Sequence, residues 1–309
     1  MSGQHQHHHG SHNHNHHHAP GGTDWGELGA HLELEAEILS PYLAQAVWVL
    51  QRRAAAGPAA VRRILDVGCG PGVATTALAL AFPDANVVAL DRAPALLDQV
   101  RQRANRLGVG GRVSTMPADL EAGLGVTEPL DIAWAAMVLH HLPDATGLLR
   151  QLHGALQPGG LMAVVEFGPP TRVLPEQLGF GAPGFARRYA EMQAAALEAH
   201  LPAGALHANW PNALANAGFE LLEQRVITVD LPAPLGEPAR RWIAQGLQRS
   251  AAMEDQTLSA DDRATLAILA DPADPRGVMQ RTDVEVHAGR SLFVARKAGN
   301  APRTPPNPS

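Results

Sequence analysis

Short, mostly apolar runs alternate with amphipathic segments along residues 61–166. Each run is rich in Val, Ile, Leu or Ala and lies next to a Gly, Pro or Asp, a pattern typical of buried strands. The segments between the runs are long enough for crossover helices, which predicts an α/β fold with parallel strands. The predicted strands are residues 64–67, 87–91, 112–116, 130–136 and 161–166.

The segment before this region predicts two helices. Residues 24–40 carry apolar residues at mixed helical spacing before Pro41, and a second apolar helix over 42–53 ends at Gly57-Pro58. Two placements are open: the helices pack against the sheet, or they lie over a ligand site. Their aromatic residues are expected first in the core and second as pocket walls, namely Trp25, Tyr42 and Trp48.

The segment after residue 166 begins with a long excursion before the next strand. Residues 183–200 predict one helix, with Phe185, Tyr189, Met192 and Leu197 near one face. Because this helix follows the carboxyl end of a strand, the ligand side of an open α/β sheet, residues 168–206 are a candidate lid. The remaining predicted elements are helices over 209–217, 237–252 and 259–270 and strands over 219–231 and 289–296.

A glycine-rich turn follows the first predicted strand. Its sequence is Ile64-Leu65-Asp66-Val67-Gly68-Cys69-Gly70-Pro71-Gly72-Val73, and an Ala/Leu-rich helix follows at once. Glycine lets the backbone approach a ligand closely, so this strand–turn–helix unit can hold a nucleotide-like molecule. The dinucleotide fingerprint requires glycine where this chain has Val73. The Asp66 carboxylate would repel a pyrophosphate but attract an ammonium group.

Two further acids lie after the second and third predicted strands. Asp91 comes about 20 residues beyond the glycines, where a carboxylate can accept both hydroxyls of a ribose. The alternative is that Asp91 caps the helix that begins near Ala93-Pro94. Asp119 lies in Pro117-Ala118-Asp119-Leu120, where the alternative is a solvated loop residue.

Residues 61–166 resemble the class I S-adenosylmethionine (SAM)-dependent methyltransferases of the small-molecule type. Besides the glycine turn and the acids, the resemblance rests on Leu139-His140-His141-Leu142 after the fourth strand and on Gln157-Pro158-Gly159-Gly160 before the fifth. It implies a doubly wound, mostly parallel, seven-stranded Rossmann-like sheet whose last strand is antiparallel. It also implies SAM as cofactor, bound by Asp66, Gly68, Cys69, Gly70, Gly72, Asp91, Arg92, Asp119, Leu120 and Ala135.

The segment after the fourth strand carries the candidate general base. His140 is expected there, with His141 as a weaker candidate, and both have a structural alternative because this segment resembles a common feature of the family. Glu166 either orients an acceptor or hydrogen-bonds the turn. Cys69 is expected to fill space, because no His or Lys lies near it in sequence.

The predicted function is methyl transfer from SAM to an O, N or C atom of a small organic acceptor by in-line displacement. Residues 135–138 offer no amide of the kind that holds a nucleobase, which argues against nucleic acid. One alternative is a nicotinamide-dependent oxidoreductase, which Val73 opposes. The other is a non-catalytic module that binds SAM or handles metal.

Charge and composition narrow the partners. The net charge is −6 and charged residues make up 17% of the chain, so no basic patch predicts a nucleic-acid partner. No apolar run is long enough to predict a membrane span. A single cysteine favours a reducing compartment, so we expect the cytoplasm. Oligomeric state is left open.

The ends of the chain have a different composition. Nine of the 16 histidines lie among the first 18 residues, mixed with Gly, Ser, Asn and Gln. Such a segment cannot form a packed core, so we expect residues 1–23 to be disordered. Nothing there fixes a coordination geometry, and no metal site is predicted. The expected layout is a tail over 1–23, helices over 24–60, the methyltransferase domain over 61–297 and a tail over 298–309.

Overall fold

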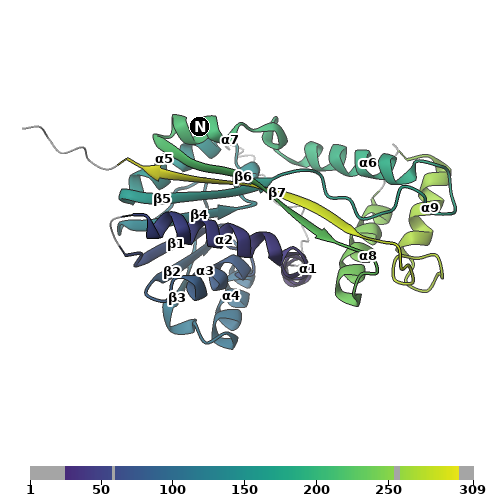
Figure 1. Cartoon of the computed structure of the whole chain (residues 1–309), viewed down its shortest axis with the longest axis horizontal. Helices are drawn as coiled ribbons and strands as arrows, with labels where there is room; N and C mark the ends of the chain where they lie inside the picture. The colour runs from purple at the N-terminus through teal and green to yellow at the C-terminus, as the bar shows by residue number, and fades with distance from the viewer. Residues whose placement is uncertain (1–24, 58–59, 254–257, 299–309) are drawn as a thin grey trace, which may run out of the picture.

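The computed structural model describes residues 25–57, 60–253 and 258–298, and its centre is a seven-stranded sheet (Figure 1). The strand order is β3-β2-β1-β4-β5-β7-β6. The strands are β1 Arg63–Val67, β2 Asn86–Asp91, β3 Val113–Pro117, β4 Leu130–Ala136, β5 Leu156–Phe167, β6 Phe219–Leu231 and β7 Val286–Lys297. The predicted α/β fold with a mostly parallel, seven-stranded sheet is confirmed. The expected tail over 1–23 lies outside the described residues, as does the tail over 298–309 except for residue 298.

The direction of the strands indicates the edge of the sheet at which a ligand would bind, called the crevice below. β1 to β5 are parallel, whereas β7 pairs antiparallel with both β5 and β6. The chain runs outward from β1 through β2 to β3 and then returns to β4 on the other side of β1. In open α/β sheets, ligands bind at the carboxyl ends of the strands beside such a reversal.

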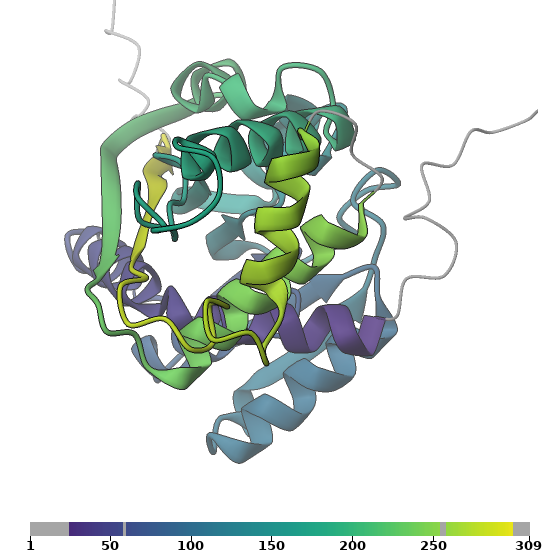
Figure 2. The ribbon, with the colours of Figure 1, turned by 90° about the vertical axis from the view of Figure 1, so that its right-hand side faces the viewer.

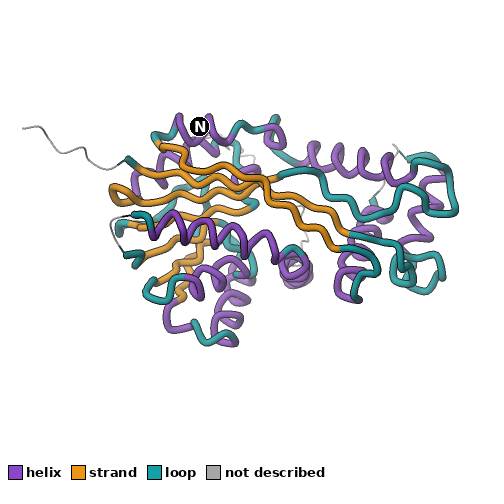
Figure 3. Tube along the Cα trace, in the orientation of Figure 1, coloured by secondary structure: helices purple, strands orange, loops and turns teal. Residues whose placement is uncertain are grey.

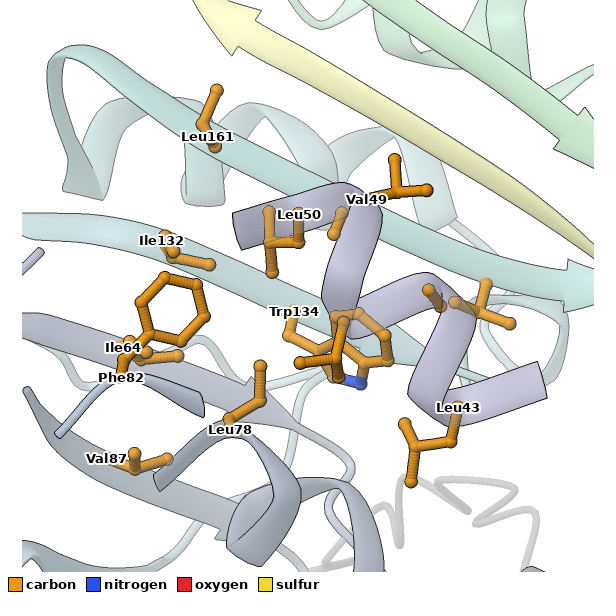
Figure 4. Close-up of a cluster of buried hydrophobic side chains, with 14 of the residues drawn as sticks. Leu43, Val49, Leu50, Ile64, Leu78, Phe82, Val87, Ile132, Trp134 and Leu161 are labelled. Atoms are coloured by element: carbon orange, nitrogen blue, oxygen red, sulfur yellow. The ribbon is translucent and has the colours of Figure 1, made fainter. Parts of the chain in front are cut away.

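Helices cover both faces of the sheet. α2, α3 and α4 lie on one face and α5 and α7 on the other, with separate hydrophobic clusters beneath them. On the α2 face, Leu43 and Leu50 meet Trp134 of β4 and Leu78 of α3 (Figure 4). The helices are α1 Trp25–Ile38, α2 Ser40–Ala55, α3 Val73–Ala81, α4 Pro94–Arg106, α5 Ala145–Ala155, α6 Phe185–His200, α7 Trp210–Asn216, α8 Glu237–Ala252 and α9 Ala260–Ala270.

A helical lobe stands on an extension of the sheet. β6 and β7 pair from Phe219 with Lys297 to Leu231 with Val286, but β5 pairs with β7 only as far as Arg290. The rest of the hairpin forms an arm beyond the sheet, with α6, α8 and α9 at its far end (Figures 1 and 3). These helices share a third hydrophobic cluster. Figure 2 shows the lobe from its far end.

Several sequence expectations differ from the structure. Trp48 is 51% exposed, because the inward stripe of α2 is formed by Leu43, Val47 and Leu50, and the Trp48 ring instead meets the Arg52 guanidinium. β5 begins at Leu156, before the Pro-Gly-Gly turn rather than after it. β7 begins three residues earlier than the predicted 289–296, because the arm extends it.

The two N-terminal helices differ in position, one on the sheet and the other beside the lobe. α2 packs on the sheet, whereas α1 lies against α4 and α8, across the space between the sheet and the lobe. No helix in the described part of the chain is long and apolar enough to cross a membrane.

The candidate lid helix, α6, is tied into the lobe. Phe185, Tyr189 and Met192 are buried in the lobe cluster, and the Arg188 guanidinium donates to both oxygens of Asp262 on α9 at 2.7 and 2.8 Å. The boundaries 168–206 of the lid stay a prediction. The packing indicates that α6 would move together with α8 and α9.

We therefore expect the amides of α6 to be protected from hydrogen exchange to the same degree as those of α8 and α9. Arg188→Met should accelerate exchange in α6, because it removes the link to Asp262, whereas Arg187→Met should not, because Arg187 is exposed and pairs within its own helix. Mass-spectrometric hydrogen exchange measures both effects. Fast exchange confined to α6 in the unaltered protein would show that α6 opens alone.

Candidate active site

The glycine turn lies in the crevice, between β1 and α3. Gly68, Gly70 and Gly72 all have positive φ, which favours glycine. A Cβ on Gly68 would collide with the side chain of Val138, whereas a Cβ on Gly70 would meet no described atom within 4 Å. Gly70 is therefore the point where the turn leaves room for a ligand against its backbone.

Asp66, at the end of β1, is a buried carboxylate with a perturbed pKa. Only 2% of the residue is exposed, and the Thr75 hydroxyl of α3 donates to Oδ2 at 2.5 Å. Burial is the main cause that raises the pKa of Asp66 to about 7; the Thr75 hydrogen bond opposes this rise and the negative charge of Asp91 adds to it. A cationic group in the crevice would stabilise the ionised form.

Asp91, at the end of β2, holds the turn in place. Oδ2 accepts the Gly70 N–H at 3.0 Å, and Oδ1 accepts the Ala93 N–H at 3.0 Å, just before α4 begins. The bond to the Ala93 N–H is the kind of contact that the helix-capping alternative for Asp91 predicts. Each carboxylate oxygen has a second lone pair, so both can still accept from a ligand. Binding of ribose stays a prediction.

The other predicted cofactor residues are only partly brought together. Cys69 is buried between the two acids, and burial together with their charges raises the pKa of its thiol, which stays neutral. Arg92 and Asp119 are exposed at the ends of β2 and β3, and Leu120, next to Asp119, is half-buried. Ala135 is fully buried in the cluster under α5, so its methyl group does not reach the crevice.

His140 and Glu166 form a buried pair beneath the crevice. His140 Nδ1 lies 2.6 Å from Glu166 Oε2, and Glu166 Oε1 accepts the Leu139 N–H at 2.9 Å. His140 is 3% exposed and Glu166 is fully buried, with the Phe167 ring 4.5 Å from the His140 ring. Glu166 thus orders the turn after β4, one of its two predicted roles, and the burial of His140 favours the structural alternative.

His141 is the exposed member of the histidine pair. Its ring centre lies 4.1 Å from that of His140. Desolvation, followed by the positive charges of His140 and Arg92, lowers the pKa of His141 to about 4. The ring is therefore neutral near pH 7 and can accept a proton.

Sequence reasoning missed two features at this edge. Met137, directly after β4, has φ of 54°, a strained conformation for a non-glycine residue that is common at functional sites. Arg290 is buried on β7 beside Tyr42 and Glu35. The available signal for Arg290 was a charged residue two positions before the apolar run Leu292-Phe293-Val294-Ala295 of the final strand.

Comparison with known proteins assigns this region. Residues 64–160 match the family model described as "Methyltransferase domain". The match begins at β1 and includes the glycine turn, the three acids and the histidine pair. Residues 64–160 form a class I methyltransferase domain. The family predicted from the sequence, the SAM-dependent methyltransferases, is confirmed.

Similar proteins share this domain rather than the whole chain. A trans-aconitate 2-methyltransferase of Methylobacterium radiotolerans is 42% identical over 105 residues, or 34% of this chain and 38% of the relative. A malonyl-[acyl-carrier protein] O-methyltransferase of Dechloromonas aromatica is 35% identical over 108 residues, 35% of this chain and 37% of the relative. The chain thus spans less than half the length of these relatives. The solved structure of the YcgJ protein from Bacillus subtilis is 16% identical, covering 83% of this chain and 99% of its own, with a TM-score of 0.49.

The crevice of the methyltransferase domain fits SAM on two observations. The open space at Gly70 accommodates a ligand close to the backbone, and the buried Asp66 carboxylate suits the ammonium of the methionine moiety. Asp91 ends β2 and Asp119 lies two residues after β3, and their roles in binding SAM stay predictions.

Asp66→Asn tests the buried charge of the methyltransferase domain. A raised pKa means that the folded protein loses stability as the pH rises from the ordinary value of 3.8 to about 7. This loss is on the order of 4 kcal/mol. The variant should therefore unfold at higher denaturant concentration than the parent at pH 8, with the difference closing near pH 4. Its affinity for SAM should fall. A variant that is less stable at pH 8 would contradict the assignment.

Asp91→Ala tests the acid at the end of β2. We expect SAM affinity to fall by about 2–4 kcal/mol, or roughly 30- to 1,000-fold, and stability to fall by about 1 kcal/mol as the Gly70 and Ala93 amides lose their acceptor. Calorimetry and thermal melting measure the two effects. Asp98→Ala, at an exposed position on α4, is the control and should leave both unchanged. Lower stability with normal SAM affinity would show that Asp91 only caps the start of α4.

Proposed function

We propose that this chain is a SAM-dependent methyltransferase that methylates a small organic acceptor. The observation that carries the proposal is the buried Asp66 carboxylate beside the open Gly70 backbone, within the matched domain. SAM supplies a methyl group made electrophilic by the attached sulfonium. The protein has to hold that group, align the acceptor and exclude water.

Residues of the chain divide these tasks. Asp66 takes the ammonium of the methionine moiety, and Asp91 takes the ribose while holding Gly70 in place. Glu166 fixes the conformation of the turn after β4 through its contacts with the Leu139 N–H and the His140 ring. α1 and the lobe of α6, α8 and α9 lie over the carboxyl ends of the strands, where they would shield the acceptor from water.

An acceptor that carries a proton at neutral pH needs a general base. His141 replaces the predicted His140 in this proposal because the residue is exposed. Its lowered pKa of about 4 keeps the ring neutral but makes it a weak base, so a bound ligand would have to raise that pKa toward neutrality. His140 already contacts Glu166 through Nδ1 and is 3% exposed. The proposed general base is therefore His141 rather than His140.

An organic acid is the acceptor class that we favour. The names of the similar proteins refer to trans-aconitate and to a malonyl group, both of which carry carboxylates. A carboxylate is ionised at neutral pH, so it attacks the methyl group without a general base. The net charge of −6 disfavours a nucleic-acid acceptor, and the cytoplasm is the expected compartment for a chain with one cysteine.

A labelling experiment tests the function. The full chain, incubated with SAM carrying an isotope-labelled methyl group and a metabolite extract, should transfer label to a small acid, and calorimetry should show binding of the demethylated product at micromolar levels. Gly70→Val, which fills the open space beside the turn, is the matched control and should abolish both. Binding of NADH but not SAM would instead support the oxidoreductase, and SAM binding without transfer would support the non-catalytic module.

A further inference from the structure

Arg290 is a buried cation at the point where β7 leaves β5. Its cross-strand partners are Phe167, the last residue of β5, and Ile227 of β6. The residue is 7% exposed, and Gly168 lies against its backbone with no room for a Cβ. Arg290 therefore stands at the carboxyl-end edge of the sheet, where the lobe-bearing arm begins.

The guanidinium of Arg290 is incompletely satisfied. Nη1 donates to its neighbour's carbonyl, Gly289 O, at 3.0 Å, and Nη2 donates to Glu35 Oε1 at 3.2 Å. Nε is buried and has no hydrogen-bond partner among the described residues. A buried charged donor without an acceptor is costly, and a bound ligand is one source of the missing acceptor.

Tyr42 connects Arg290 to the cofactor crevice. The guanidinium carbon lies 5.6 Å from the centre of the Tyr42 ring. Burial raises the pKa of Tyr42, the charge of Arg290 lowers it, and the charges of Glu35 and Asp66 raise it. The Tyr42 hydroxyl on α2 is thus close enough to both Asp66 and Arg290 for their charges to shift its pKa.

The sheet places Asp66 and Arg290 on one face, at a distance that a ligand can span. Asp66 pairs with Trp134, whose side chain belongs to the α2-face cluster, as does that of Leu292, two residues from Arg290. Because side chains alternate along a strand, Asp66 and Arg290 both point to the α2 side. β4 and β5 separate β1 from β7, which corresponds to roughly 14 Å across the sheet. The register runs from Asp66 through Trp134 and Ala163 to Val294, so Arg290 lies four residues, or roughly 13 Å, further along the strands toward the carboxyl edge.

We propose that Arg290, beside Tyr42, binds a carboxylate of a ligand in this crevice, opposite the ammonium that Asp66 takes. The planar guanidinium fork matches a carboxylate in two parallel hydrogen bonds, and the unused Nε–H is one arm of that fork. The inference rests on the proposed function. Two ligands carry this group: the methionine moiety of SAM and an organic-acid acceptor.

Glu35 provides a check on a purely structural role. It already contacts Nη2, but its side chain is 32% exposed and it also lies 3.9 Å from His31. If Arg290 served only to hold α1 through Glu35, then Glu35→Gln and Arg290→Met would have the same effect. As a binding residue, Arg290 should keep or improve its affinity for a carboxylate when Glu35 becomes neutral.

Calorimetry with paired ligands distinguishes the two sources. One pair is S-adenosylhomocysteine and its analogue without the carboxylate, and the other is trans-aconitate and its trimethyl ester. The unaltered protein should prefer the acid of at least one pair by tenfold or more, roughly the strength of a charge-assisted pair. Arg290→Met should remove that preference, Arg290→Lys should retain part of it, and Glu35→Gln should retain all of it.

Each outcome has a defined meaning. Loss of preference in the first pair assigns Arg290 to the methionine carboxylate, and loss in the second assigns it to the acceptor. Unchanged preferences in a folded Arg290→Met protein, or no preference in the unaltered protein, overturn the proposal. If Arg290→Met does not fold, the same ratios in Arg290→Lys decide. Binding of trans-aconitate through Arg290 without any binding of S-adenosylhomocysteine would overturn the proposed methyl transfer and leave the carboxylate site standing.

Discussion

The hydrogen bonding of β7 on both of its edges is the interaction on which the rest of the molecule depends. On one side β7 pairs with β5, which belongs to the parallel core, and on the other it pairs with β6 along its whole length. The strand therefore joins two bodies with separate hydrophobic clusters, the sheet core and the helical lobe. Without this shared ladder, α6, α8 and α9 would have no fixed position over the crevice.

Several buried charged residues lie at one edge of the sheet. Asp66, the Glu166–His140 pair and Arg290 all lie at or just beyond the carboxyl ends of the strands, each at most 7% exposed. Burying such groups costs stability unless partners satisfy them. Glu166 and His140 satisfy one another, whereas Asp66 has a raised pKa and Arg290 has an unpaired Nε. Asp66 and Arg290 are the two buried charges at this edge that we assign to ligands.

The family match includes the residues expected to bind the cofactor but not the elements that cover the crevice. It ends at Gly160, before Glu166, the lobe and Arg290. Within it lie the glycine turn and the acids expected to hold SAM, and outside it lie the elements that cover the crevice. Methyltransferases that share a domain can therefore differ in acceptor, because the acceptor meets the variable elements.

The sequence by itself determined the local features of this protein. Apolar runs, glycines and prolines act over a few residues, so all seven strands, the helices between them and the turn at Gly68, Gly70 and Gly72 were predictable. The spacing of the motifs was sufficient to predict the family and to place acids near the ends of β1, β2 and β3.

Only the tertiary structure decided which side chains meet across long separations in the chain. Arg290 joins Glu35 and Tyr42 because β7 enters the sheet antiparallel between β5 and β6, a pairing that no local pattern encodes. Trp48 is exposed because the helix face, rather than its apolar character, sets its direction. His140 and His141 are adjacent in sequence, yet one is buried against Glu166 and the other exposed, because burial depends on what the rest of the chain packs around each ring.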